Sequence, residues 1–159
     1  MALIIDPDGL PASRPVVERV QEFIDPMTLG ATVMVEARSE LVAVGDGLGD
    51  GRANIGAHFV AVAPEGVFID IAFAAELEHG ANPARVQADA LAALTAYLRG
   101  LALDTPENEG IIVRISSIST RLYALDGLID HTGLTINGQT ANLALSDTQI
   151  PAPGTVRIN

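Results

Sequence analysis

Residues 66–77, GVFIDIAFAAEL, place an apolar side chain at every second position. The acidic residues Asp70 and Glu76 lie at the intervening positions, so one face of the segment is more polar than the other. A period of two predicts a β-strand with one buried face. The predicted buried face consists of Val67, Ile69, Ile71, Phe73, Ala75 and Leu77.

A long amphipathic helix is predicted at 84–103, directly after this strand. Asn82 suits the N-cap, and Pro83 suits the first helical position, where its missing N–H costs nothing. The leucines of this helix lie mostly on one face, and burying each one is worth about 1.5–3 kcal/mol. The helix should therefore pack on the sheet that contains residues 66–77, and residues 111–113 should add a short buried strand. Its predicted buried face consists of Val86, Ala90, Leu91, Leu94, Leu98 and Leu101.

The N-terminal part predicts a strand at 2–5, a helix at 14–25 and two β-hairpins. Residues 29–37 with 41–44, and residues 55–63 with 67–71, each begin with an aliphatic residue followed by Gly-Ala. We interpret each pair of apolar stretches as a hairpin, because short alternating runs separated by turn residues are typical of hairpins.

Residues 45–51, GDGLGDG, lie between the two predicted hairpins and do not have the spacing of a known ligand-binding loop. A calcium loop that starts at Asp46 needs an acid at its twelfth position, which is Ala57. A dinucleotide loop should open a helix, whereas a strand is predicted here, and a Walker-type loop needs a lysine, which the chain lacks. We therefore expect a mobile, solvated, metal-free connector, with a cation or small-ligand binding module as the alternative.

The sequence of the C-terminal part predicts a short helix, a hairpin and a final strand. Ser116 or Ser117 can cap the helix, Gly127 can close it, and Asn137-Gly138 between apolar runs is a strong hairpin signal. The last strand is expected at 155–158.

The predicted fold class is α+β, with a ferredoxin-like βαββαβ sandwich over residues 1–115. Its strands are 2–5, 58–63, 67–77 and 111–115, and residues 27–44 form an inserted hairpin that the core does not require. Residues 116–159 would follow as a helix-plus-hairpin appendage or subdomain. The alternative is two small αβ subdomains that meet near Gly110.

Composition narrows the classes of function. The 159 residues include nine arginines, no lysine, no cysteine and 20 acidic residues, which gives a formal charge of −11. Disulfides and thiolate metal sites are therefore excluded, and direct binding to nucleic acid or to anionic membrane is not expected. No apolar run reaches the roughly 18 residues that span a bilayer, and the N-terminus does not resemble a signal peptide.

No group of side chains has the spacing of a catalytic, cofactor or metal site, so we predict none and expect a protein that is not an enzyme. The histidines His58, His79 and His131 are far apart in sequence, and no Gly-x-Ser-x-Gly elbow surrounds the serines near 116–119. A small carboxylate-dependent hydrolase is the remaining enzymatic alternative. It would use one of the acid pairs 6/8, 76/78 or 107/109.

The C-terminal third resembles the end of baseplate J-like proteins, which are structural proteins of contractile phage tails of the Mu type and of related prophages. The resemblance rests on VRISSI at 113–118, LTING at 134–138, ANLAL at 141–145 and IPAPGTV at 150–156. Earlier segments fit in the same order, namely GLPAS at 9–13, IDP at 24–26 and the segment 49–57. Relative to that family, residues 27–44 look like an insertion, and an N-terminal portion is absent.

The resemblance implies a non-catalytic structural component of a phage or prophage tail baseplate, which acts through protein–protein contacts. It implies other baseplate proteins and copies of the chain itself as partners, and the virion tail, after synthesis in the bacterial host cytoplasm, as the location. We expect the isolated chain to be a monomer or a weak oligomer.

Overall fold

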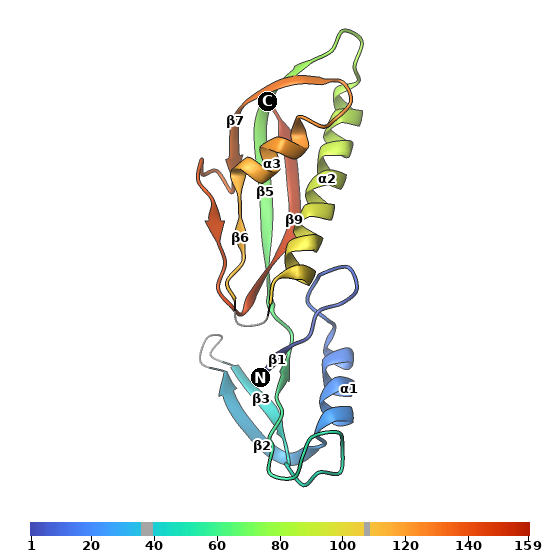
Figure 1. Cartoon of the computed structure of the whole chain (residues 1–159), viewed down its shortest axis with the longest axis vertical. Coiled ribbons are helices and arrows are strands. Elements are labelled where there is room, and N and C mark those ends of the chain that lie inside the picture. The colour runs from blue at the N-terminus through green and yellow to red at the C-terminus, as the bar shows by residue number, and fades with distance from the viewer. Residues whose placement is uncertain (36–39, 107–108) are drawn as a thin grey trace. The chain divides into compact units, whose positions relative to one another are not determined.

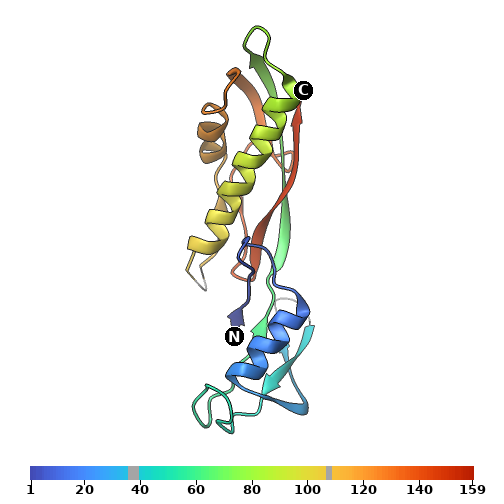
Figure 2. The same cartoon turned by 90° about the vertical axis from the view of Figure 1, so that its right-hand side faces the viewer.

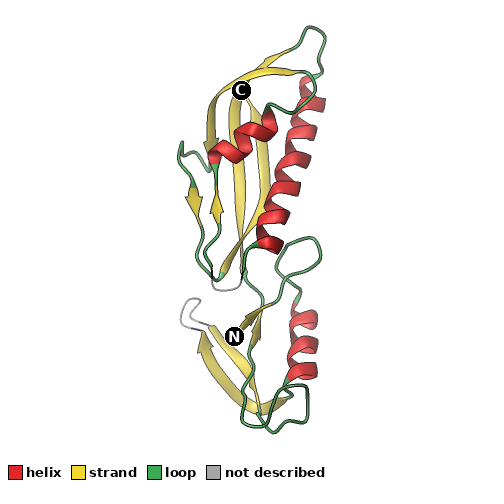
Figure 3. Cartoon of the chain, viewed as in Figure 1, coloured by secondary structure: helices red, strands yellow, loops and turns green. Residues whose placement is uncertain are grey.

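The computed structural model describes residues 1–35, 40–106 and 109–159, and the side chains of all of these except 28–35 and 40–43. The chain divides into two compact units (Figure 1). The first unit comprises Met1–Pro7 and Pro11–Glu65, and the second comprises Asp8–Leu10 and Gly66–Asn159. Helices and strands occur in both (Figure 3), which confirms the predicted α+β class.

The first unit contains one helix and two small sheets. Strand β1 pairs in parallel with β4, and β2 pairs antiparallel with β3. The first predicted hairpin is therefore confirmed as β2–β3, although its residues 36–39 lie outside the described residues. The second predicted hairpin is wrong, because β4 pairs with β1 and not with the strand that follows it. The elements are β1 (Ala2–Leu3), α1 (Arg14–Ile24), β2 (Met27–Val35), β3 (Glu40–Gly45) and β4 (Ala61–Val62).

The second unit is built on a three-stranded sheet with the order β7-β5-β9, in which β5 and β7 are antiparallel. The two helices of this unit lie on the same side of the sheet (Figure 2). A small antiparallel sheet joins β6 and β8. The elements are β5 (Glu65–Leu77), α2 (Pro83–Asp104), β6 (Ile112–Val113), α3 (Ile115–Leu122), β7 (Leu128–Ile136), β8 (Leu143–Ala144) and β9 (Gln149–Ile158).

The ferredoxin-like strand order is not the observed one. The predicted strands at 2–5 and 58–63 pair with each other, and those at 67–77 and 111–115 lie in two further sheets. A long central strand needs backbone partners on both sides, and β5 finds them in β7 and β9. Residues 116–159 therefore complete the sheet of β5, and the predicted boundary between residues 115 and 116 does not coincide with the observed division.

The core of the second unit confirms the alternation predicted for β5. Ile69, Ile71 and Phe73 are at most 1% exposed, and they pack against apolar residues of α2, α3, β6, β7 and β9. One residue of the predicted α2 face is misplaced, because Leu91 is 39% exposed whereas Tyr97 is buried. The predicted N-cap of α2 is present: the side-chain oxygen of Asn82 accepts the N–H of Ala84 at 3.0 Å.

The predicted N-cap of α3, Ser116 or Ser117, lies C-terminal to the observed one. The helix begins at Ile115 with Arg114 at the N-cap position, and no side chain there makes a capping hydrogen bond. The Ile115 N–H instead donates to the side-chain oxygen of Asn142 at 3.0 Å. A residue distant in sequence thus satisfies an N–H at the start of this helix, where the sequence suggested capping by Ser116 or Ser117.

The Asn-Gly turn forms where it was predicted, but the hairpin around it is short. Asn137 and Gly138 have φ values of 49° and 77°, and Ile136 and Gln139 exchange two backbone hydrogen bonds of 2.8 Å. These are the left-handed conformations of a two-residue hairpin loop. The chain then leaves β7, and β8 pairs with β6.

Candidate functional site

The structure brings together a serine and a histidine that sequence spacing did not connect. Ser119 Oγ, on α3, lies 2.9 Å from His131 Nε2, on β7. The two residues are twelve positions apart and belong to different elements, so only the packing of α3 against β7 reveals the pair. A serine hydrogen-bonded to a histidine is the first requirement for nucleophilic catalysis, and the remaining geometry decides whether catalysis is feasible.

Aromatic side chains hold the His131 ring on two sides. The Tyr123 ring centroid lies 4.6 Å from that of His131, and Phe73 approaches the ring edgewise at 6.0 Å. The second ring nitrogen, Nδ1, is buried and has no hydrogen-bond partner among the described residues. In a serine–histidine–acid triad this nitrogen donates to a carboxylate, which fixes the tautomer and stabilises the cationic ring. Within the described ranges, no carboxylate forms a hydrogen bond with it.

The nearest acid in sequence, Asp130, is used in a different way. Its Oδ1 accepts the Tyr123 hydroxyl at 2.7 Å and the His131 backbone N–H at 2.7 Å. The hydrogen bond from Tyr123 is the main reason why the pKa of Asp130 lies below its usual 3.8, and the same bond raises the pKa of Tyr123 above 10.0. These four residues therefore form a polar link between α3 and β7, and they lack the orienting acid of a hydrolase.

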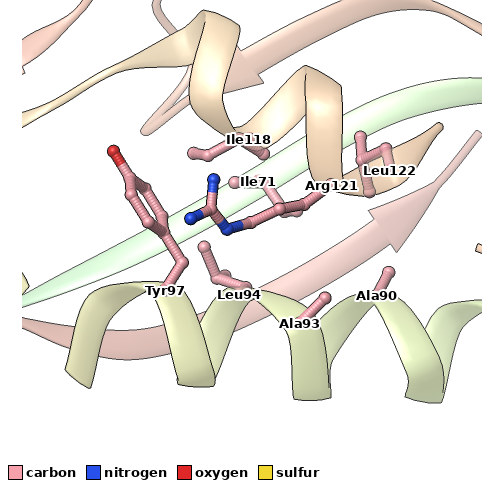
Figure 4. Close-up of a pocket in the computed structure, with 8 residues that line it drawn as sticks. All are labelled: Ile71, Ala90, Ala93, Leu94, Tyr97, Ile118, Arg121 and Leu122. Carbon is pink, nitrogen blue, oxygen red and sulfur yellow. The ribbon is translucent and has the colours of Figure 1, made fainter. Parts of the chain in front are cut away.

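A small apolar cavity lies between α2 and α3, over β5 (Figure 4). Its volume is about 10 Å³, which is at the lower limit for a single water molecule. The Arg121 guanidinium lies 4.1 Å from the centroid of the Tyr97 ring and donates to the Ser117 carbonyl at 2.8 Å. The cavity is too small for a substrate. Its lining residues are Ile71, Ala90, Ala93, Leu94, Tyr97, Ile118, Arg121 and Leu122.

The glycine loop 45–51 folds around a buried carboxylate in the first unit. Asp25 is 1% exposed, and its two oxygens accept the backbone N–H groups of Gly47 at 3.0 Å and Phe59 at 2.9 Å. A Cβ at Gly45 would overlap this carboxylate, and one at Gly51 would lie 2.5 Å from the Ile24 carbonyl oxygen. The expectation of a solvated connector is therefore wrong for Gly45 and Gly47, which are both buried. At Gly45 only a residue without a Cβ permits this approach to Asp25.

Gln21 completes the buried polar network of the first unit. Its amide nitrogen donates to the carbonyls of Asp25 at 2.8 Å and Phe59 at 3.0 Å, and its amide oxygen accepts the Ala61 N–H at 2.8 Å. The side chain of Gln21 thus ties helix α1 to strand β4. Its neighbours in the sequence are Val20 and Glu22, and its polar residue type gave no indication that it is buried.

The other residues considered from sequence do not converge on one site. His58 Nδ1 lies 2.9 Å from the Gly45 carbonyl oxygen, and His79 is exposed in a turn. Glu107 lies outside the described residues. Within the described ranges, no three His, Asp or Glu side chains are grouped as metal ligands, and no helix combines the length and apolar character needed to cross a bilayer.

Large apolar side chains are exposed in both units. In the first unit Ile55 is 84%, Leu48 64% and Phe23 61% exposed, and the Arg52 guanidinium lies 5.3 Å from the centroid of the Phe23 ring. In the second unit Phe68 is 69% exposed on β5, at a position that alternates with the buried face. Exposed aromatic side chains and arginines are enriched where proteins contact one another.

Comparison with known proteins identifies one family. Residues 69–159 match the family described as "Baseplate J-like protein C-terminal domain". The chain is also 27% identical over 150 residues to the phage-like element PBSX protein XkdT of Bacillus subtilis (strain 168). That alignment covers 93% of this chain and 36% of the relative, so the chain spans about a third of the length of the curated relative it matches.

Proposed function

The chain belongs to the baseplate J-like protein family, and from this premise we propose that it is a non-catalytic structural component of a phage or prophage tail baseplate. The observation that carries the proposal is the position of the family match. The match begins at residue 69 and continues to residue 159, and the second compact unit contains residues 66–159. The family domain and the unit with the large hydrophobic core are therefore nearly the same piece of chain.

Protein–protein contact is the mode of action that these surfaces favour. The second unit has a sheet with helices on one side, and Phe68 is exposed on its strand β5. With a net charge of −11 the chain repels phosphate backbones, whereas exposed apolar groups and arginines can dock on a protein. We propose other baseplate proteins and further copies of this chain as partners, with the virion tail as location after synthesis in the host cytoplasm.

The polar groups that the structure assembles support a structural role. Both oxygens of Asp25 already accept backbone N–H groups, and Asp130 is occupied by Tyr123 and by its neighbour's N–H. In these arrangements each carboxylate holds two segments of chain together. Carboxylates that join segments of the chain in this way are expected in a structural protein.

A complementation experiment tests the proposal. The gene that encodes this chain would be replaced in its host by a version without residues 66–159, and tails would be counted by electron microscopy after induction. We expect tails without complete baseplates, and we expect restoration by the intact gene but not by a copy with Phe68→Asp. A copy with Thr95→Asp, an exposed change on α2, is the matched control. Normal baseplates in the absence of residues 66–159 would contradict the proposal.

A further inference from the structure

Asn137 joins the turn after β7 to β5 through three hydrogen bonds. Its side-chain oxygen accepts the Asp70 N–H at 2.7 Å, and its side-chain nitrogen donates to the Phe68 carbonyl at 3.1 Å. Its backbone N–H donates to the Asp70 carbonyl at 2.8 Å. Asn137 thus extends the β5–β7 pairing beyond the last paired residues, Ile71 and Ile136.

The residue that follows makes this asparagine chemically labile. Gly138 has no side chain to shield its backbone nitrogen. Apart from the glycine and its two chain neighbours, no heavy atom of the described residues lies within 4 Å of the position where its Cβ would be. Asparagine is a thermolabile residue, and the nitrogen of a following glycine can attack its side-chain carbonyl carbon. Asn137-Gly138 is the only Asn-Gly pair in the sequence.

We propose that Asn137 is a site of spontaneous deamidation, and that its hydrogen bonds to β5 gate the reaction. The Gly138 nitrogen loses its proton to a base and forms a bond to Asn137 Cγ. The Cγ–Nδ2 bond then breaks, and Nδ2 takes a proton back from the protonated base and leaves as ammonia. Water then opens the resulting succinimide at either carbonyl, which gives aspartate or isoaspartate. The side chain must first release Asp70 and Phe68, because Cγ has to turn toward Gly138.

The modified residue cannot restore the link to β5. An aspartate at 137 can still accept the Asp70 N–H, but it has no hydrogen to donate to the Phe68 carbonyl and places a negative charge against that oxygen. An isoaspartate adds a methylene to the main chain, so the exchanged bonds between Ile136 and Gln139 are also disturbed. Conversion therefore weakens the edge of the central sheet irreversibly. This inference is independent of the role in a baseplate.

Peptide mapping by mass spectrometry tests the proposal on the full chain. Folded and urea-unfolded protein would be incubated side by side at alkaline pH, and conversion of Asn137 would be followed over time. Two hydrogen bonds of ordinary strength should slow conversion in the folded chain roughly 30-fold. Asn142, which precedes the bulky Leu143, is the internal control and should stay unmodified in both samples.

Two results would overturn the proposal. Equal rates in folded and unfolded chain would show that the hydrogen bonds do not gate the reaction, and the absence of conversion in urea would show that Asn137 is not a site. The Asn137→Asp variant tests the consequence separately: we expect it to unfold at a lower urea concentration than the parent, and an unchanged midpoint would refute the claimed weakening. The rate comparison needs no variant, so it stands even if Asn137→Asp fails to fold.

Discussion

Replacing Asp25 with alanine should lower the stability of the first unit and leave that of the second unit unchanged. The change removes the acceptor of two backbone N–H groups, those of Gly47 and Phe59, from a side chain that is 1% exposed. The hydrogen bond from Gly47 is buried and that from Phe59 is partly buried. Leaving an N–H without an acceptor in such a place costs about 1–3 kcal/mol, so the expected loss is roughly 2–6 kcal/mol, with the smaller share at Phe59. Asp25→Asn keeps one oxygen and should cost about half as much.

Amide hydrogen exchange followed by NMR measures this loss at the two groups concerned. If exchange proceeds by local opening, the amides of Gly47 and Phe59 should exchange roughly 30-fold to 10⁴-fold faster in the alanine variant. The only tyrosines, Tyr97 and Tyr123, are in the second unit, so tyrosine fluorescence should report an unchanged transition there.

A matched control uses a half-buried acid of the same loop, Asp46. Asp46 Oδ1 accepts the N–H of Leu48 at 2.9 Å near the surface, where water can replace it. Asp46→Ala should therefore leave exchange at Gly47 and Phe59 close to that of the parent. If Asp25→Ala behaves like this control, Asp25 does not organise the loop and our account of the glycine positions is wrong.

Four further substitutions test other parts of the structure. Hydrogen bonds from β9 hold the pKa of exposed Asp70 below its ordinary 3.8. The contribution of Asp70 to folding stability is therefore complete above pH 3.8 and is lost as the pH falls through the lower pKa of the folded state. In Asp70→Asn the urea midpoint should fall less steeply with decreasing pH in the acid range than it does in the parent. Gly51→Ala should destabilise the first unit through contact with a backbone carbonyl. Gly100→Ala, inside α2, would place a Cβ in ordinary contact with the Asp104 carboxylate at 3.8 Å and should raise stability by about 0.5–1 kcal/mol in urea unfolding. Ser119→Ala should lower the stability of the second unit by about 0.5–1.5 kcal/mol in thermal unfolding, because His131 Nε2 loses its partner.

Local patterns predicted most of the elements correctly. The alternation through Phe73, the Asn82-Pro83 start of α2 and the Asn137-Gly138 turn all depend on residues close in sequence, and the structure confirms them. The family resemblance is also confirmed by the match over 69–159. Such features are encoded within a few residues, so periodicity and turn chemistry are sufficient to find them.

Strand pairing was not predictable in the same way. Residues 67–77 carry a clear buried face, but nothing in that face says whether its neighbours come from residues 58–63 or from residues 128–136 and 149–158. The choice depends on contacts between residues far apart in sequence. The same limit applies to the polar groups: Gln21 and the Ser119–His131 pair become visible only after helices have packed on strands.

Electron cryomicroscopy of purified tails tests the central claim most directly. Tails would be prepared from the phage or prophage that encodes this chain, and the baseplate density would be searched for the second unit, with α2 and α3 on one side of the β7-β5-β9 sheet. We predict several copies of this unit in the baseplate, each in contact with neighbouring proteins. Complete baseplates whose density contains no copy of the unit would contradict it.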